Sequence, residues 1–351
     1  MMRALLFLFI FLGAGVASAQ TSTLYVVEEN GSRANHVNIV FLSEGYTTTD
    51  LPHFAGHVQQ AVQFLFSKEP WQHYRSYCNI YRIEVASNES GCDNGSNSPR
   101  GGSSIRDTYF NTGFNTPSVP QLLSLGSEGQ EKAYDLLNAH VPEYTIAIVL
   151  VNDVKYGGSG GDIAVASINP QSAAIAEHEL GHSFGGLADE YDVDYPIYTP
   201  TEKPNTTAVS VREQIRWRHW VDETTPVPTP ETSSYDALVG LFEGSMYRTV
   251  GWYRPHLDSV MRNLGRPVRQ VNREHLILQF YNRVGPVNSR APADASIVVS
   301  GATTLDFNVA VKTPSVGPTL TKVWKVNGVV VPEAVSDSFS IETATLGNGT
   351  H

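Results

Sequence analysis

Residues 178–191 read HELGHSFGGLADEY, and this stretch governs the interpretation of the whole chain. His178 and His182 stand four residues apart, so on a helix both imidazoles lie on one face and can reach one metal ion. Glu179 follows the first histidine, where its carboxylate can take a proton from a metal-activated water. The motif therefore predicts a Zn²⁺ site on a helix, with Glu179 as the catalytic base.

A catalytic zinc takes three protein ligands and keeps one position for water. In the spacing H-E-x-x-H-x-x-G-x-x-H, Gly185 occupies the glycine position and Ala188 the position of the third ligand. Alanine cannot coordinate a metal, so we expect Asp189 to be the ligand, with Glu190 as the alternative. Glu274 is a weaker alternative, because a second group of zinc peptidases takes this ligand from a glutamate on a later helix.

The pattern of apolar residues on both sides of the motif predicts an α/β (α+β) domain with a mixed sheet. Strands are expected at 37–42, 80–86, 144–151 and 162–168, and helices at 50–66, 130–140, 170–184 and 270–284. Residues 87–116 are rich in Asn, Ser and Gly and predict a long surface loop. The glycine run at 155–161 predicts a turn beside the cleft, before an edge strand that can pair with an extended substrate, and a surface hairpin without a functional role is the alternative.

The texture of the sequence changes near residue 285. Short alternating strands at 295–300, 304–312, 321–331 and 338–343 predict an immunoglobulin-like β-sandwich. The region is too short for the usual seven strands, so this domain is expected to be truncated. We divide the chain into a signal peptide (1–19), a metallopeptidase catalytic domain (20–284) and an immunoglobulin-like domain (285–351).

The N-terminus has the features of a cleavable signal peptide. Arg3 is followed by an apolar run at 5–16 and by Ala17-Ser18-Ala19, which predicts cleavage after Ala19 and a secreted or periplasmic protein. No later stretch is long and apolar enough to span a membrane. Export permits a disulfide between Cys78 and Cys92, whose loop closure would contribute about 3 kcal/mol.

Charge and composition restrict the class of partner. The 351 residues include 24 Lys plus Arg and 35 Asp plus Glu, for a net charge of −11, and 41% are hydrophobic. The apolar content excludes a disordered chain, and the negative charge argues against nucleic acid as a partner. A protein or peptide substrate is expected, and the sequence indicates no oligomeric state.

Several stretches beyond the zinc motif carry a family resemblance. They read VFLSEGYT (40–47), YRIEVASNESG (81–91), VNDVKYGGSGG (151–161) and YRPHLDSVMR (253–262). Together with residues 178–191, they resemble the IgA-peptidase-like zinc metallopeptidases, a family placed among the metzincins. The resemblance covers most of residues 37–284 and implies a zinc peptidase, but immunoglobulin A does not carry over as the substrate.

The resemblance to metzincins also implies a Met-turn, the apolar floor beneath the zinc, and we assign it to Met261. Some metzincins place an oxyanion-stabilising tyrosine two residues after this methionine, where this chain has Asn263. Tyr253, Arg254 and Tyr191 are candidates for that role.

We therefore predict a secreted zinc endopeptidase in which Glu179 is the general base and passes its proton to the leaving amine. Two alternatives remain open from the sequence. One is a non-catalytic module that binds protein or glycan on the same scaffold, although the intact Glu179 disfavours it. The other is a zinc amidase that acts on cell-wall peptide.

Overall fold

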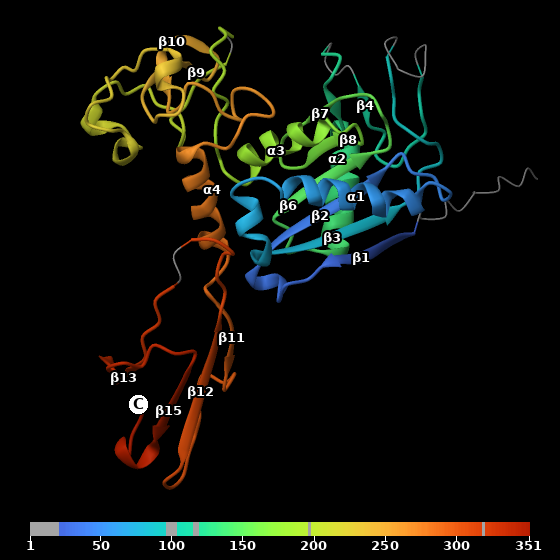
Figure 1. The fold of residues 1–351 in the computed structure, drawn as a ribbon. Coiled ribbons are helices and arrows are strands. Elements are labelled where there is room, and N and C mark those ends of the chain that lie inside the picture. Colours follow the sequence, from blue (N-terminus) through green and yellow to red (C-terminus); the bar gives the residue numbers. More distant parts are fainter. Residues whose placement is uncertain (1–20, 96–103, 115–118, 196–197, 318–319) are drawn as a thin grey trace, which may run out of the picture.

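The computed structural model describes residues 21–95, 104–114, 119–195, 198–317 and 320–351. The predicted signal peptide and part of the predicted surface loop at 87–116 lie outside these residues. Figure 1 shows three parts: a sheet lobe (21–189), a second lobe (190–269) and a C-terminal module (285–351), with one helix between the last two. None of the described helices is both long and apolar enough to cross a bilayer.

The sheet lobe is built on a mixed sheet, as predicted, with the strand order β1-β3-β2-β6-β8-β7. The inner strands β3, β2, β6 and β8 are parallel, and the edge strands β1 and β7 run antiparallel to their neighbours. The predicted edge strand at 162–168 is wrong, because β8 is an inner strand and the glycine run itself forms the edge. The strands are β1 (Ser22–Glu28), β2 (Val37–Glu44), β3 (Cys78–Val85), β6 (Ile146–Val151), β7 (Gly158–Ser159) and β8 (Ala164–Ser167).

Helices cover both faces of this sheet. α1 (Leu51–Leu65) and α3 (Ser172–Ser183) pack on one face, and α2 (Gly126–His140) packs on the other. Side chains alternate along β2, so that Ile39 and Phe41 join the first core cluster while Val40 and Leu42 join the second. A strand covered on both faces is apolar without interruption, which explains the run at 37–42.

The predicted disulfide is wrong. Cys78 and Cys92 are both free and buried. Cys78 belongs to the core cluster on the α1–α3 face of the sheet, and Cys92 belongs to the cluster on the α2 face. A bridge between them would have to pass through the sheet.

The described part of the predicted surface loop packs against the end of β2. The Glu44 carboxylate is fully buried and accepts hydrogen bonds from the hydroxyls of Thr108 and Thr112 and from the backbone N–H of Phe110 and Thr112. Four donors on one buried carboxylate satisfy its charge and hold the loop on the sheet. The short strands β4 (Gly113–Phe114) and β5 (Leu123–Ser124) pair beside it.

The second lobe has a small core of its own around Trp217, which is almost fully buried with Ile215, Leu241 and Tyr253. The hairpin of β9 (Phe242–Ser245) and β10 (Arg248–Arg254) was not predicted. α4 (Gln270–Arg283) connects this lobe to the C-terminal module (Figure 1). Short 3₁₀ helices occupy Arg33–Asn35, Trp71–His73, Arg75–Tyr77, Arg212–Gln214, Arg218–Trp220, Ser233–Tyr235 and Thr343–Thr345.

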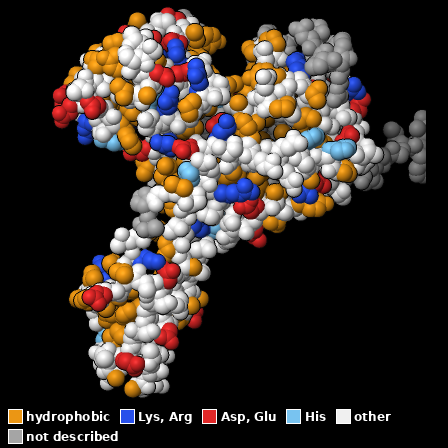
Figure 2. Space-filling view, in the orientation of Figure 1, with side chains coloured by type: hydrophobic (Ala, Val, Ile, Leu, Met, Phe, Trp, Pro, Cys, Tyr) orange, Lys and Arg blue, Asp and Glu red, His pale blue; other side chains and the backbone are white. Residues whose placement is uncertain are grey.

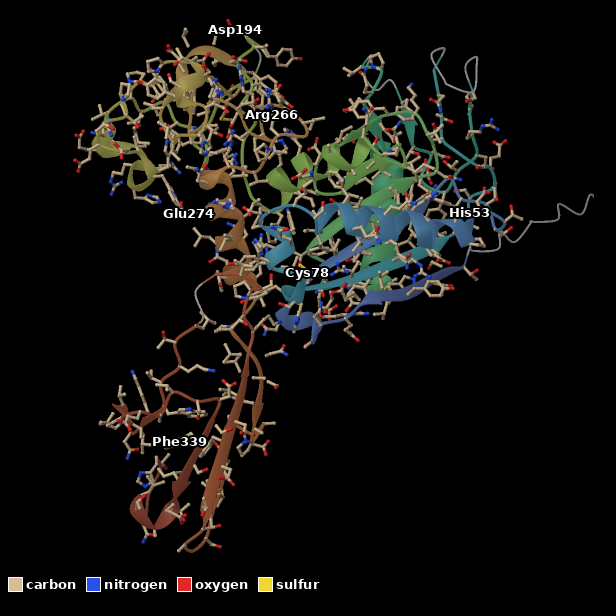
Figure 3. The ribbon with its side chains drawn as sticks, viewed as in Figure 1. His53, Cys78, Asp194, Arg266, Glu274 and Phe339 are labelled. Carbon is tan, nitrogen blue, oxygen red and sulfur yellow. The ribbon has the colours of Figure 1, made fainter. Side chains whose placement is uncertain are left out.

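The C-terminal module contains a three-stranded antiparallel sheet of β11 (Val287–Ala291), β12 (Thr304–Val311) and β15 (Ser338–Glu342). β13 (Lys325–Val326) and β14 (Val329–Val330) form a hairpin. The ring of Trp324, the residue before this hairpin, stacks on the ring of Phe339, with 5.4 Å between the centroids (Phe339 is labelled in Figure 3). The strand predicted at 295–300 is wrong; β11 provides the edge strand instead. The immunoglobulin-like sandwich stays a prediction.

The module joins the sheet lobe through a buried lysine. The Lys312 ammonium contacts His36 Nε2, and it donates to the Asn35 carbonyl at 3.3 Å. The Tyr77 hydroxyl donates to the Lys312 carbonyl at 3.0 Å. Burial lowers the pKa of Lys312 to about 8.

Candidate metal centre

Three side chains converge at the C-terminal end of α3. His178 Nε2 lies 3.1 Å from His182 Nε2, and Asp189 Oδ1 lies 3.1 Å from the first of these nitrogens and 3.3 Å from the second. In the described part of the chain, these residues form a group that could hold a metal ion. We call them the three donors.

Each histidine is oriented by its other ring nitrogen. His178 Nδ1 donates to the Val260 carbonyl at 2.9 Å, and His182 Nδ1 donates to the Leu187 carbonyl at 2.8 Å. A carbonyl can only accept, so the neutral ring carries its proton on Nδ1 and leaves a lone pair on Nε2. Both lone pairs therefore face the same point, which is the usual arrangement of zinc-binding histidines.

The spacing of the three donors fits zinc. With metal–ligand bonds of about 2.0–2.1 Å, tetrahedral coordination separates two ligand atoms by about 3.3 Å. The three distances here are 3.1, 3.1 and 3.3 Å. Without a cation, two neutral nitrogen acceptors would repel each other and the carboxylate at this range. The two-nitrogen, one-oxygen set thus fits a zinc ion with a position left for water.

The electrostatics of the group agree with this geometry. Burial alone would raise the pKa of Asp189, but the two histidines, whose rings donate to its carboxylate when they are protonated, outweigh burial and hold that pKa below its usual value. Burial alone would lower the pKa of His182, and the bond to Asp189 reverses this and raises it. The carboxyl of Asp189 is therefore ionised and available to a cation.

The turn after α3 returns the chain to the histidines. Gly186 has a φ of +63°, a left-handed conformation that glycine adopts freely and that commonly ends a helix. Beyond it, the side chain of Asn205 bonds to the residues on both sides of Asp189. It accepts a hydrogen bond from the Ala188 N–H and donates to the Ala188 carbonyl and to Glu190 Oε1.

Adjacent carboxylates have separate surroundings. Asp189 faces the histidines, whereas Glu190 is fully buried and points into the protein. Glu190 accepts hydrogen bonds from Asn205, Ser259 and Asn272 at 2.9, 2.7 and 3.0 Å. Burial raises the pKa of Glu190, although these three bonds oppose it. Glu190 joins segments that are distant in sequence and does not belong to the three donors.

Met261 lies directly beneath α3, fully buried. A Cβ atom on Gly181 would come within 2.4 Å of the Met261 sulfur, so the glycine of the zinc motif provides the space that the methionine occupies. The Met261 carbonyl also accepts a hydrogen bond from the Glu190 N–H at 2.9 Å. This apolar floor is where the resemblance to metzincins places a Met-turn.

Glu179 lies beneath the glycine run at the sheet edge. A Cβ atom on Gly160 would come within 1.7 Å of Glu179 Oε2, so no side chain fits at position 160 while the carboxylate stays in place. Burial raises the pKa of Glu179, and the charges of His178 and His182 partly oppose this effect. The glycine run is thus beside the site, as predicted.

Other candidates from the sequence lie apart from the three donors. Glu274 lies on the side of α4 facing away from α3 and bonds to His219 and Trp220 (Figure 3). Tyr253 packs in the core of the second lobe, and Arg254 is buried, donating to the carbonyls of Glu243 and Gly244. Asn263 is exposed and bonds to Asp258.

Three residues that follow Glu190 closely in the sequence lie near the site or pair with other residues. Tyr191 stacks near His178, with ring centroids 6.0 Å apart. Two further acids near the site have partners of their own: Asp192 pairs with Arg262 at 2.5 Å, and Asp194 accepts hydrogen bonds from Thr249 at 3.1 Å.

One residue beside the site was missed. The Tyr247 hydroxyl donates to Asp189 Oδ2 at 2.9 Å. It belongs to the turn of the unpredicted β9–β10 hairpin, and its position 58 residues after Asp189 follows no motif that the sequence displays.

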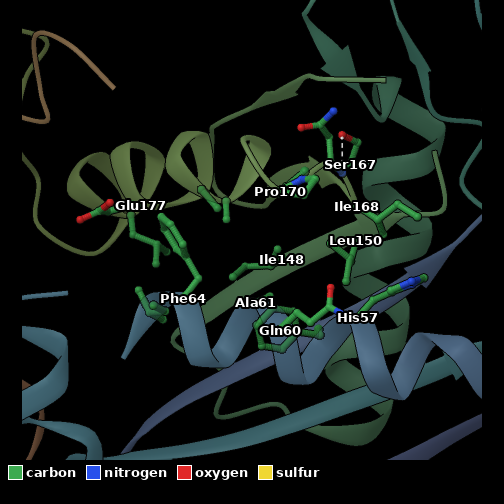
Figure 4. A pocket seen from close by; sticks show the side chains of 17 residues that line it. His57, Gln60, Ala61, Phe64, Ile148, Leu150, Ser167, Ile168, Pro170 and Glu177 are labelled. Atoms are coloured by element: carbon green, nitrogen blue, oxygen red, sulfur yellow. Dashed lines mark hydrogen bonds between the residues drawn. The ribbon is translucent and has the colours of Figure 1, made fainter. Parts of the chain in front are cut away.

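The surface around the site is hollowed on one side. Figure 2 shows a notch between the sheet lobe and the second lobe, and α3 lies at its base (Figures 1 and 2). A separate cavity of about 200 Å³ lies between α1 and α3 (Figure 4). Its lining is mainly apolar and includes Phe64, Ile148 and Glu177. Burial raises the pKa of Glu177 to about 7. None of the three donors lines this cavity, so it is distinct from the metal centre.

A model of the family described as IgA Peptidase M64 matches residues 26–235, which is more than half of the chain. The chain belongs to this family. Membership of the IgA Peptidase M64 family makes the protein a peptidase and indicates a metal cofactor, and it confirms the family predicted from the sequence. Curated proteins give no match to the chain. The match includes the three donors and Glu179 but ends before Tyr247 and Met261.

Proposed function

We propose that this protein is a secreted or periplasmic zinc endopeptidase that cleaves extracellular proteins. The observation that carries the proposal is the arrangement of His178, His182 and Asp189, whose ligand atoms have the separations of a tetrahedral zinc site. Secretion rests on the predicted signal peptide at 1–19. The division into a catalytic domain (20–284) and an immunoglobulin-like domain (285–351) belongs to the same proposal.

When bound to the three donors, Zn²⁺ would supply Lewis-acid activation of water and of the scissile carbonyl. The chain's own groups do the rest. The Val260 and Leu187 carbonyls keep the two imidazoles in the tautomer that binds a metal. Glu179 takes the proton from the attacking water and passes it to the leaving amine.

The glycine run gives the substrate a place to bind. Gly160 and Gly161 are exposed and follow the edge strand β7, and Gly160 lies directly beside Glu179. An extended peptide can pair with such a backbone, which would hold the scissile bond over Glu179. Binding of an extended polypeptide in this way would favour cleavage within a chain, which is the activity of an endopeptidase.

The first experiment measures zinc content by elemental analysis and cleavage of casein with and without 1,10-phenanthroline. We expect about one zinc per chain and cleavage that the chelator abolishes. Glu179→Gln is the matched variant, because it keeps the size of the side chain and removes the base. It should bind zinc normally and lose roughly 10²–10⁴-fold in rate.

Two outcomes would contradict the proposal. A protein that takes up no transition metal, even when zinc is supplied, has no such centre. Zinc binding with no cleavage of any protein would favour the alternatives, and soluble cell-wall peptides would then separate an amidase from a binding module.

A further inference from the structure

The turn that carries Tyr247 has an unusual backbone. Met246 and Tyr247 are the two residues between the paired ends of β9 and β10, Ser245 and Arg248. Their φ angles are +49° and +58°, so both are left-handed. Two-residue hairpin turns with positive φ at both positions usually contain Asn-Gly, because larger L residues adopt this conformation at a cost. Bulky residues in strained turns are typical of functional sites.

The strained turn is bonded to the chain around Asp189. The Met246 N–H donates to the Asp189 carbonyl at 3.2 Å, and the Tyr247 N–H donates to the Tyr191 carbonyl at 3.0 Å. The Tyr247 ring packs against the rings of Tyr198 and Tyr191, at 4.9 and 5.5 Å between centroids. Both its backbone and its ring are therefore fixed, and the hydroxyl is directed at one atom.

That atom is the outer oxygen of the Asp189 carboxylate. Oδ1 faces the two histidine nitrogens, and Oδ2 accepts from the Tyr247 hydroxyl at 2.9 Å. A carboxylate with one oxygen engaged in this way presents only the other to a cation. Coordination through one oxygen leaves the fourth position of a tetrahedral site to water.

We propose that Tyr247 is a positioning residue that orients Asp189 so that Oδ1 alone binds the metal. The inference rests on the proposed function, because it requires that the three donors bind zinc. Hydrogen bonds to metal ligands typically contribute 10–100-fold to metal affinity, so the Tyr247 hydroxyl is expected to have an effect of this size.

The test compares Tyr247→Phe with Tyr198→Phe in the full chain. Each variant removes one hydroxyl from the same aromatic cluster, but only Tyr247 bonds to Asp189. Zinc affinity is measured by competition with a chromophoric chelator, coordination by the visible absorption of the Co²⁺-substituted protein, and folding by the melting temperature of the metal-free protein.

Tyr247→Phe should weaken zinc binding by about tenfold or more and change the Co²⁺ spectrum. Tyr198→Phe should change neither, and both metal-free variants should melt as the parent protein does. A Tyr247→Phe protein with parental or higher zinc affinity and an unchanged spectrum overturns the inference while the proposed function stands. If the parent protein itself binds no zinc, the proposed function fails instead.

Discussion

Replacing Gly160 with alanine adds a methyl group where the Glu179 carboxylate lies. The new carbon would be 1.7 Å from Glu179 Oε2 and 2.4 Å from Cδ. To regain an ordinary van der Waals separation, the oxygen must retreat by about 1.5 Å or more. Gly160 does not have the left-handed φ that an alanine would strain, so the displaced carboxylate is the main consequence.

The size of the effect follows from the role proposed for Glu179. A displacement of about 1 Å at a reacting group can cost 10²-fold in rate, and loss of a general base costs roughly 10²–10⁴-fold. We therefore expect kcat/KM to fall at least about 10²-fold, which corresponds to about 2.7 kcal/mol of barrier. The three heavy atoms nearest to a Cβ at position 160 all belong to Glu179, so zinc affinity should not change.

The assay is hydrolysis of a quenched fluorescent peptide, with zinc content and melting temperature measured on the same samples. Gly56→Ala is the control, because a Cβ at that position of α1 meets nothing within 4 Å. A Gly160→Ala protein with full activity would refute the placement of Glu179 as the base. Loss of zinc in this variant would show instead that position 160 supports the metal centre.

Other substitutions test the remaining assignments. Asp189→Ala should lower zinc affinity at least about 100-fold without lowering the melting temperature of the metal-free protein. Glu190→Ala should instead lower the stability of the protein by about 3 kcal/mol, because three buried donors lose their acceptor. Calorimetry and metal titration would show whether the two roles are reversed. Gly181→Ala should displace the Met261 sulfur, now 2.4 Å from the added carbon, and reduce both stability and zinc affinity; a protein with normal values for both would rule out a close contact. Burial lowers the pKa of Lys312 from 10.5 to about 8, so the unfolded chain holds more protons between these values and the free energy of unfolding should rise with pH across that window. Urea titrations at several pH values should show this rise in the parent protein and lose it in Lys312→Met; the same slope in both would exclude Lys312 as its source.

The sequence predicted those parts of the fold whose pattern is local. The buried strand at 37–42 and the helix at 50–66 agree with β2 and α1, because burial imposes a recognisable period on each element. The two histidines could be placed together for the same reason, since four residues make one turn of a helix. The motif spacing places the third ligand at Ala188, and Asp189 is predicted because alanine cannot coordinate a metal, with Glu190 as the alternative.

What the sequence left out depends on contacts between distant segments. Cys78 and Cys92 are close in sequence, but only the sheet topology places them on opposite faces. The β9–β10 hairpin lacks both alternation and an Asn-Gly turn, so neither its strands nor Tyr247 could be recognised. The role of Gly160 likewise becomes visible only when the glycine run lies over α3.

The bond between His178 and the Val260 carbonyl spans 82 residues of chain, and this has a consequence for when the protein can take up its metal. During synthesis, both histidines emerge long before the carbonyl that fixes the first ring. The bond from Asn272 to Glu190 spans the same distance and closes the same region. We expect a nascent chain that ends near residue 235 to hold zinc weakly, and tight loading to begin only after about 40 further residues have folded onto α3. A fragment limited to residues 26–235, which match the family, would therefore be a poor source of active enzyme.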